Sequence, residues 1–134
     1  MTDPRFEPSA PFSETDIEAI ESEIGRKLPD SYRDFVREYG GAFVGGLVDG
    51  SGELPVMRFI GASGNYGVLD MLKLHSDLRE DRILPIADCE FGNLYVFDRE
   101  NRVHYINYYG GRTSARKVAD NFQEFIDRIV VSEE

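Results

Sequence analysis

Residues 83–107, ILPIADCEFGNLYVFDRENRVHYIN, hold three short apolar segments separated by two polar segments that favour turns. The apolar segments are rich in β-branched and aromatic residues and belong to RILPIA (82–87), NLYVFD (93–98) and VHYINYY (103–109). Such residues favour extended strands, and short polar connections join neighbouring strands that run in opposite directions. The stretch therefore predicts a meander of antiparallel strands, with DCEFG and REN at its turns.

Two helices are predicted on the N-terminal side of this meander. Ser13 is a suitable N-cap with Asp16 three residues later, and isoleucines follow at helical spacing until Gly25. Pro29 suits the first position of a second helix, which the glycine pair at 40–41 ends. These two helices should form a helical hairpin.

The region between the hairpin and the meander predicts two strands and one helix. AFVGGLV (42–48) and LPVMRFIG (54–61) have strand-type sequences and flank DGSGE (49–53), which contains an Asp-Gly turn signal. Residues 67–80, GVLDMLKLHSDLRE, have a helical composition and spacing. We expect this inserted helix to cover the sheet.

A final helix is predicted near the C-terminus. Asp120 and Gln123 match a capping box, and apolar residues recur at helical spacing at Phe122, Phe125, Ile126 and Ile129. Together these elements predict an α+β domain. We expect an antiparallel sheet of about five or six strands, flanked by the N-terminal helical hairpin, the inserted helix and the C-terminal helix.

Length and composition predict one soluble domain. The chain has 134 residues, of which 41% are hydrophobic and 30% are charged. Residues 1–12 contain three of the six prolines and are expected to be a leader on the surface, pinned by Phe6 or Phe12, while residues 13–134 form the domain. The chain shows neither a membrane-spanning run nor a signal-peptide pattern, so we expect a cytoplasmic protein.

The charge balance bears on the class of partner. The chain has 25 acidic and 15 basic residues and a net charge of -10. This balance argues against direct nucleic-acid binding, which requires basic groups to neutralise phosphates. It would attract a basic partner, although an acidic surface also serves solubility alone.

Cys89, the single cysteine, is the obvious candidate nucleophile. A catalytic thiol needs a nearby base and surroundings that favour the thiolate, whereas Asp88 and Glu90 disfavour a further negative charge. His104 is the one plausible base, but pairing across the DREN turn places it beside Phe97, roughly 10 Å or more along the sheet from the thiol. We therefore expect no catalytic residue and interpret the cysteine as part of a turn.

Metal and cofactor sites have little support in the sequence. His75 and His104 belong to different predicted elements, and DGSGE lacks most of the oxygen ligands of a calcium loop. RFIGASGNYGVLD places a glycine-rich loop between a strand and a helix, but it lacks the Lys-Ser/Thr pair of a phosphate-binding loop. We expect no metal and no cofactor.

The order of these segments resembles the SUKH superfamily, which includes yeast cell-wall assembly regulators and many bacterial immunity proteins. LPDSYRDFVREYGG resembles the second helix of the family, the opening stretch its central strands, and NFQEFIDRI its last helix. The residues that carry the resemblance are Leu28, Pro29, Tyr32, Phe35, Tyr39, Gly40, Gly41, Pro85, Gly92, Asn93, Asp98, Phe122, Phe125 and Ile126. It extends over about residues 13–130.

The resemblance implies a binding protein that is not an enzyme. Bacterial members are mostly taken to neutralise toxins, often nucleases or nucleic-acid deaminases, inside the producing cell. This implies a basic toxin domain as the protein partner, with no direct contact to nucleic acid or membrane. A regulatory or scaffold module of the same fold is one alternative, and a small hydrolase or transferase that uses Cys89 is another.

Acidic side chains around the predicted strand at 82–87, and two tyrosines beyond a later strand, are candidate contacts for such a partner. Acidic groups steer a basic protein toward a surface, and tyrosines serve as anchors within interfaces. The candidates are Glu80, Asp81, Asp88, Glu90, Tyr108 and Tyr109. The same residues also fit a solvated rim with tyrosines that cap the core, and the sequence does not separate the two interpretations.

Overall fold

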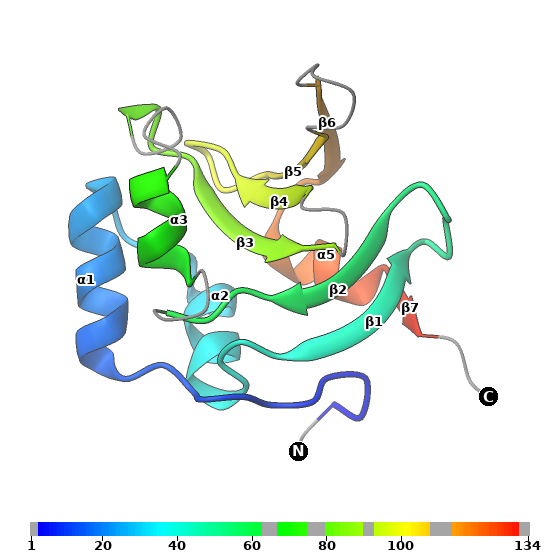
Figure 1. Cartoon of the computed structure of the whole chain (residues 1–134), viewed down its shortest axis with the longest axis horizontal. Helices are drawn as coiled ribbons and strands as arrows, with labels where there is room; N and C mark the ends of the chain where they lie inside the picture. The colour runs from blue at the N-terminus through cyan, green and yellow to red at the C-terminus, as the bar shows by residue number, and fades with distance from the viewer. Residues whose placement is uncertain (1–2, 63–66, 75–79, 90–92, 108–113, 132–134) are drawn as a thin grey trace.

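The computed structural model describes residues 3–62, 67–74, 80–89, 93–107 and 114–131. In this part of the chain, four helices and seven strands form (Figure 1), and no helix is both long and apolar enough to cross a membrane. The helices are α1 (Glu14–Ile24), α2 (Asp30–Glu38), α3 (Val68–Leu74) and α5 (Phe122–Asp127). The strands are β1 (Phe43–Val48), β2 (Pro55–Phe59), β3 (Leu84–Asp88), β4 (Leu94–Phe97), β5 (Val103–Asn107), β6 (Ser114–Ala119) and β7 (Ile129–Val131).

The strands form one antiparallel sheet in the order β6-β5-β4-β3-β2-β1-β7. The predicted α+β class is confirmed, and the sheet has seven strands instead of the expected five or six. The sequence misses β6 because SARKVA is polar and shows no strand pattern. It also misses β7, whose Ile129 continues the helical spacing of α5 although the helix ends at Asp127.

The predicted cap of α1 is confirmed, whereas the predicted cap of α5 is wrong by one residue. Ser13 and Asp16 form the expected capping box. At α5, the side chain of Asn121 accepts a hydrogen bond of 2.8 Å from the backbone N–H of Glu124. Asn121 has the extended backbone that an N-cap requires, with φ -159° and ψ 173°, while Asp120 forms an ion pair with a lysine of β6.

An aromatic cluster joins α2 and α5 to the sheet. The ring centre of Phe122 on α5 lies 5.2 Å from that of Tyr32 and 5.3 Å from that of Phe35, both on α2. It also lies 5.9 Å from the ring of Phe97 on β4 and 6.1 Å from that of Phe59 on β2. All five side chains are buried. The helix predicted near the C-terminus therefore packs its aromatic residues against the core.

The leader packs on the edge of the sheet. Phe6 and Phe12 are both buried, and the backbone of Glu7 forms an antiparallel bridge with Phe43 at the start of β1. The guanidinium of Arg5 donates hydrogen bonds to one backbone carbonyl in α5 and one in β7, at 2.9 and 2.7 Å. These contacts tie the N-terminal segment to both β1 and the C-terminal elements.

Arg128, which follows α5, connects two distant parts of the sheet. Its guanidinium forms an ion pair with Asp49 in the β1–β2 turn, with 2.9 Å between Nε and Oδ1, and donates to the carbonyl of Val118 on β6. Arg116 of β6 lies 3.5 Å from Glu53 of the same turn. The edge strand β6 and the β1–β2 turn therefore approach one another, and the sheet is curled (Figure 1).

Asp98 organises the turn between β4 and β5. One carboxylate oxygen accepts hydrogen bonds from the backbone N–H groups of Glu100 and Arg102, at 2.8 and 3.0 Å. The other oxygen contacts the guanidinium of Arg102 and the ring of His104, at 2.9 and 2.8 Å. Partial burial raises the pKa of Asp98, but these hydrogen bonds outweigh burial and lower the pKa to about 2.

We predict that Gly40 does not tolerate a side chain. Gly40 has φ 65°, and a Cβ there would lie 2.3 Å from the carbonyl oxygen of Ala10 in the leader. Gly40→Ala should lose about 1–2 kcal/mol from the left-handed backbone and about 1–3 kcal/mol more from displacing the leader. Gly50→Ala is the matched control, because Gly50 has φ 70° and its Cβ would have no neighbour within 4 Å. Equal losses for the two variants in urea unfolding would contradict close packing of the leader.

We predict a stability change at acid pH that depends on Asp98. Because folding lowers the pKa of this carboxyl from 3.8 to about 2, its stabilisation is present above pH 4 and is lost as the pH falls toward 2. Asp98→Asn should be less stable than the native protein by about 1–2 kcal/mol at pH 7, and this difference should shrink between about pH 4 and pH 2. Urea unfolding at several pH values measures it, and a difference that does not change with pH would contradict the assignment.

Candidate functional site

Cys89 is buried, and its nearest polar partners are neutral groups. The residue is 4% exposed, and its sulfur lies 3.8 Å from the hydroxyl of Tyr105. That hydroxyl accepts a hydrogen bond of 3.0 Å from the side chain of Asn93. Burial raises the pKa of Tyr105, so the phenol stays protonated and is not a base for the thiol. The arrangement fits a structural cysteine inside the sheet.

His104 takes part in the β4–β5 turn. It lies opposite Val96 and not beside Phe97, so the predicted register is wrong by one residue. The cause is the hydrogen bond of 2.9 Å from the N–H of Asp98 to the carbonyl of Arg102, which closes the turn and pairs the residues beyond it. The imidazole lies 2.8 Å from the Asp98 carboxylate, so this ring is already engaged away from the thiol.

The described residues contain no group of three or more His, Cys, Asp or Glu side chains that could hold a metal ion. The DGSGE segment forms the β1–β2 turn, and Arg128 engages the carboxylate of Asp49 within it. Of the glycine-rich loop before α3, positions 63–66 lie outside the described residues, and so does His75. The sequence-based statements on those positions stay predictions.

Of the six predicted partner contacts, Glu80 and Asp81 are exposed in the segment before β3. Asp81 lies 3.8 Å from Arg99, and both side chains are about two-thirds exposed, at 64% and 67%. An ion pair of this kind contributes little to stability, so the acidic group remains accessible to a partner. Glu90, Tyr108 and Tyr109 lie outside the described residues.

Asp88 lies at the other end of β3 and is buried. It is 9% exposed, and its Oδ2 accepts a hydrogen bond of 3.0 Å from Nε of Arg58, its ladder partner on β2. Burial raises the pKa of Asp88, and the guanidinium opposes this change. The carboxylate therefore links two central strands and adds little negative charge to the accessible surface. The structure does not bring it together with Glu80 and Asp81.

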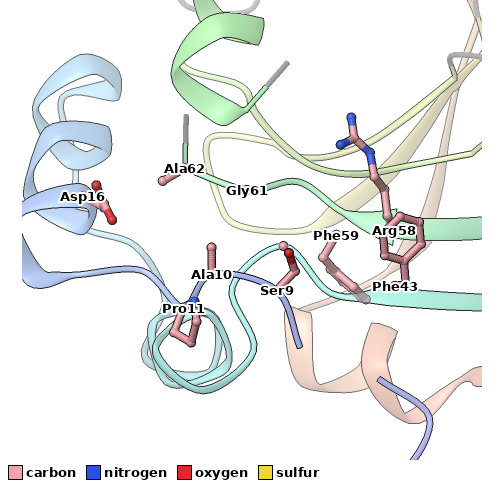
Figure 2. Close-up of a pocket in the computed structure, with 10 residues that line it drawn as sticks. Ser9, Ala10, Pro11, Asp16, Phe43, Arg58, Phe59, Gly61 and Ala62 are labelled. Atoms are coloured by element: carbon pink, nitrogen blue, oxygen red, sulfur yellow. The ribbon is translucent and has the colours of Figure 1, made fainter. Parts of the chain in front are cut away.

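A hollow of about 350 Å³ lies between the leader, the start of α1 and the strands β1 and β2 (Figure 2). Its charged lining residues are Asp16 and Arg58, which lie on different sides of it in Figure 2. Asp16 is engaged in the cap of α1 and Arg58 pairs with Asp88. A small-molecule site needs polar groups that converge on the ligand, and neither of these two groups is available without losing its partner. We assign no ligand to this hollow.

A set of exposed apolar side chains is not evident from the sequence pattern. Phe43, Met57 and Val130 are 52%, 37% and 53% exposed and lie on β1, β2 and β7. The composition of AFVGGLV and LPVMRFIG predicts strands, but apart from Arg58 their residues are apolar or glycine on both faces, so the pattern does not show which face packs inward. The available signal is the absence of charged residues from β1.

The comparison with protein families gives a match over most of this fold. A family model described as the SMI1 / KNR4 family (SUKH-1) matches residues 11–128. The matched region begins before α1 and ends just after α5, so it contains the helical hairpin, six of the seven strands and the C-terminal helix. Among curated proteins, no match to the chain is found. The same segments carry the resemblance seen in the sequence, and the chain belongs to the SMI1 / KNR4 family (SUKH-1).

Proposed function

We propose that the protein is a non-enzymatic binding protein of the immunity class, which neutralises a bacterial toxin by covering its active or substrate-binding face. Membership of the SUKH family carries this proposal, because the family is known for immunity and regulatory roles and is generally non-catalytic. The protein would act in the cytoplasm of the cell that produces the toxin, and one molecule would bind one toxin domain. The regulatory module is the alternative within the same family.

The charge of the chain supports a basic partner of the nuclease or deaminase class. A toxin that acts on nucleic acid needs a basic surface to hold its substrate, and this chain has a net charge of -10. Oppositely charged surfaces accelerate association through long-range attraction. Among the sequence-predicted contacts, the exposed Glu80 and Asp81 are suited to this role, and Glu90, Tyr108 and Tyr109 stay candidates from the sequence.

The proposal predicts that the chain protects cells from a toxin domain encoded beside its gene. Co-expression should restore survival, and the two proteins should co-purify at a one-to-one ratio. The Cys89→Ala variant should protect as well as the native chain, because the proposal gives no chemical role to this buried thiol. Loss of protection in a Cys89→Ala variant that keeps its thermal stability would favour the enzyme alternative. Failure to protect against any toxin domain from the same locus would favour the regulatory module.

The proposal also predicts an association rate that falls as salt rises. The association rate constant with a catalytically inactive toxin domain should drop about tenfold or more between about 15 and 150 mM NaCl, because screening weakens long-range attraction. The dissociation rate should change much less. Stopped-flow fluorescence or biolayer interferometry measures both rates. An association rate that is independent of salt would contradict electrostatic steering while leaving the survival result intact.

A further inference from the structure

The outward side chains of β1, β2 and β7 form an apolar surface, which we name the open face. In β1, Val48 is fully buried and a Cβ at Gly46 would lie 2.8 Å from the side chain of Ile129, so both positions face the core. Because side chains alternate along a strand, Leu47 faces outward, and its ladder partners on the neighbouring strands lie beside it. The β1–β2 register shifts between Phe43 and Gly46, so alternation does not place Phe43, whose ladder partner is Arg58. Phe43 and Gly45 are included because they line one hollow together with Met57. The open face consists of Phe43, Gly45, Leu47, Pro55, Met57 and Val130.

None of these six residues carries a charge, and Arg58, which lies opposite Phe43 in the ladder, is paired with Asp88. In Figure 1, α5 lies behind β1 and β2, α2 lies near their left-hand ends, and no described helix lies in front of these strands. An antiparallel sheet with one solvated face normally carries polar side chains on that face. The open face instead presents Phe43 and Val130 at more than half exposure, and Met57 at 37%. A contiguous exposed apolar surface of this kind is typical of an interaction site.

Two hollows are lined by residues of both the open face and the leader. Phe43, Gly45 and Met57 line a hollow of about 720 Å³ together with leader residues 4–8. Val130 lines a second hollow of about 380 Å³ with Pro4 and Arg5, and these two leader residues also line the first. A Cβ at Gly45 would have no neighbour within 4 Å, so a partner can approach the backbone of β1 closely. The surface can therefore receive projecting side chains.

Among the described charged side chains around the hollows, one carboxylate, that of Glu7, is accessible to a partner. Arg5 is neutralised by Asp3, with 2.8 Å between the guanidinium and the carboxylate. Glu7 is exposed, lines the larger hollow and belongs to the residue pair that bridges the leader to Phe43. Within the described part of the chain, its carboxylate has no ion-pair partner. The surface is thus apolar with a negative group at its rim.

We infer that the open face is the docking surface for a basic protein partner, which places apolar side chains in the hollow beside Phe43 and Met57 and a lysine or arginine against Glu7. This inference rests on the proposed function, because it assigns the surface that contacts the toxin. Charge complementarity selects this occupant: a second copy of the chain would bring together two molecules of net charge -10, each with Glu7 at the rim.

The first test changes the apolar part of the surface. The probe is the catalytically inactive toxin domain that the native chain neutralises in co-expression. Phe43→Ser and Met57→Gln should each weaken its binding by about thirtyfold or more, mainly through faster dissociation, as expected for central apolar anchors. Ala115→Ser on β6 is the control, because it makes an exposed position polar on the opposite edge strand, and it should bind as the native chain does. Thermal unfolding checks that all three variants remain folded.

The second test separates local from overall charge. Glu7→Gln and Glu18→Gln each change the net charge from -10 to -9, and both residues are exposed, but Glu18 lies on α1 outside the open face. Glu7→Gln should slow association at low salt about threefold or more relative to Glu18→Gln, because only Glu7 faces the docking partner. Equal rates for the two variants would overturn the role assigned to Glu7.

The outcomes distinguish this inference from the proposed function. Native-like binding by Phe43→Ser and Met57→Gln would overturn the docking surface, whereas protection by the native chain would still support the immunity role. Failure of the native chain to protect would instead remove the proposed function and, with it, this inference. Sedimentation equilibrium of the purified chain tests the other occupant: a dimer that Phe43→Ser converts to a monomer would show a self-association surface and overturn docking of a basic partner.

Discussion

The ring of Phe122 lies where α2, α5, β2 and β4 meet, and the rest of the fold depends on its burial. The helix that carries it has six residues, which is too short to be stable without tertiary contacts. Edge-to-face contacts with rings on α2 and on the sheet hold that helix in place. The position of α5 in turn sets the positions of Arg128 and β7. The aromatic cluster therefore determines both the curl of the sheet and the strand that completes the open face.

The sequence predicts the elements that are specified by nearby residues, such as a helix with its cap and apolar spacing. It misses the strands that form only because a neighbouring strand pairs with them. The capping box at Ser13 and the isoleucine spacing after it specify α1 without reference to the rest of the chain. β6 and β7 instead become strands because a neighbouring strand lies beside them, through ladders to β5 and β1. The one-residue error at His104 has the same origin, since the Asp98 turn sets that register and the strand pattern does not.

The candidate site was less predictable than the fold because exposure depends on which face the helices cover. Asp88 has the sequence context of a turn carboxylate, yet β3 extends to this residue and pairs it with Arg58 of β2, where it is buried. The strand pattern of β1 and β2 is correct, but its apolar residues lie on both faces, so periodicity does not identify Phe43 and Met57 as exposed. The resemblance to the family indicates the class of function without naming the surface, because the residues that carry it are mainly buried core residues, glycines and turn residues.

Several arginines of this acidic chain form ion pairs and hydrogen bonds within the fold. These contacts reduce the positive charge that a partner encounters at the surface. Arg58 joins two central strands, Arg128 joins the β1–β2 turn to β6, and Arg5 fastens the leader. Because each of these cations is paired with a carboxylate, its charge is largely cancelled at short range. Exposed acidic groups such as Glu7, Glu18 and Glu80 are then left to determine the field at longer distances.

Fast association and slow dissociation require different properties of a binding surface. Negative charge spread over the molecule accelerates encounter with a basic protein, but exposed ion pairs contribute too little free energy to keep the two proteins together. An inhibitor must also exclude the toxin's substrate for as long as the toxin is active, and slow dissociation of this kind normally comes from apolar groups that are well packed in the complex. In the described part of the chain, the exposed large apolar side chains are confined to the strands of the open face. The acidic surface would therefore set how fast a toxin is captured, and Phe43 and Met57 would set how long it is held.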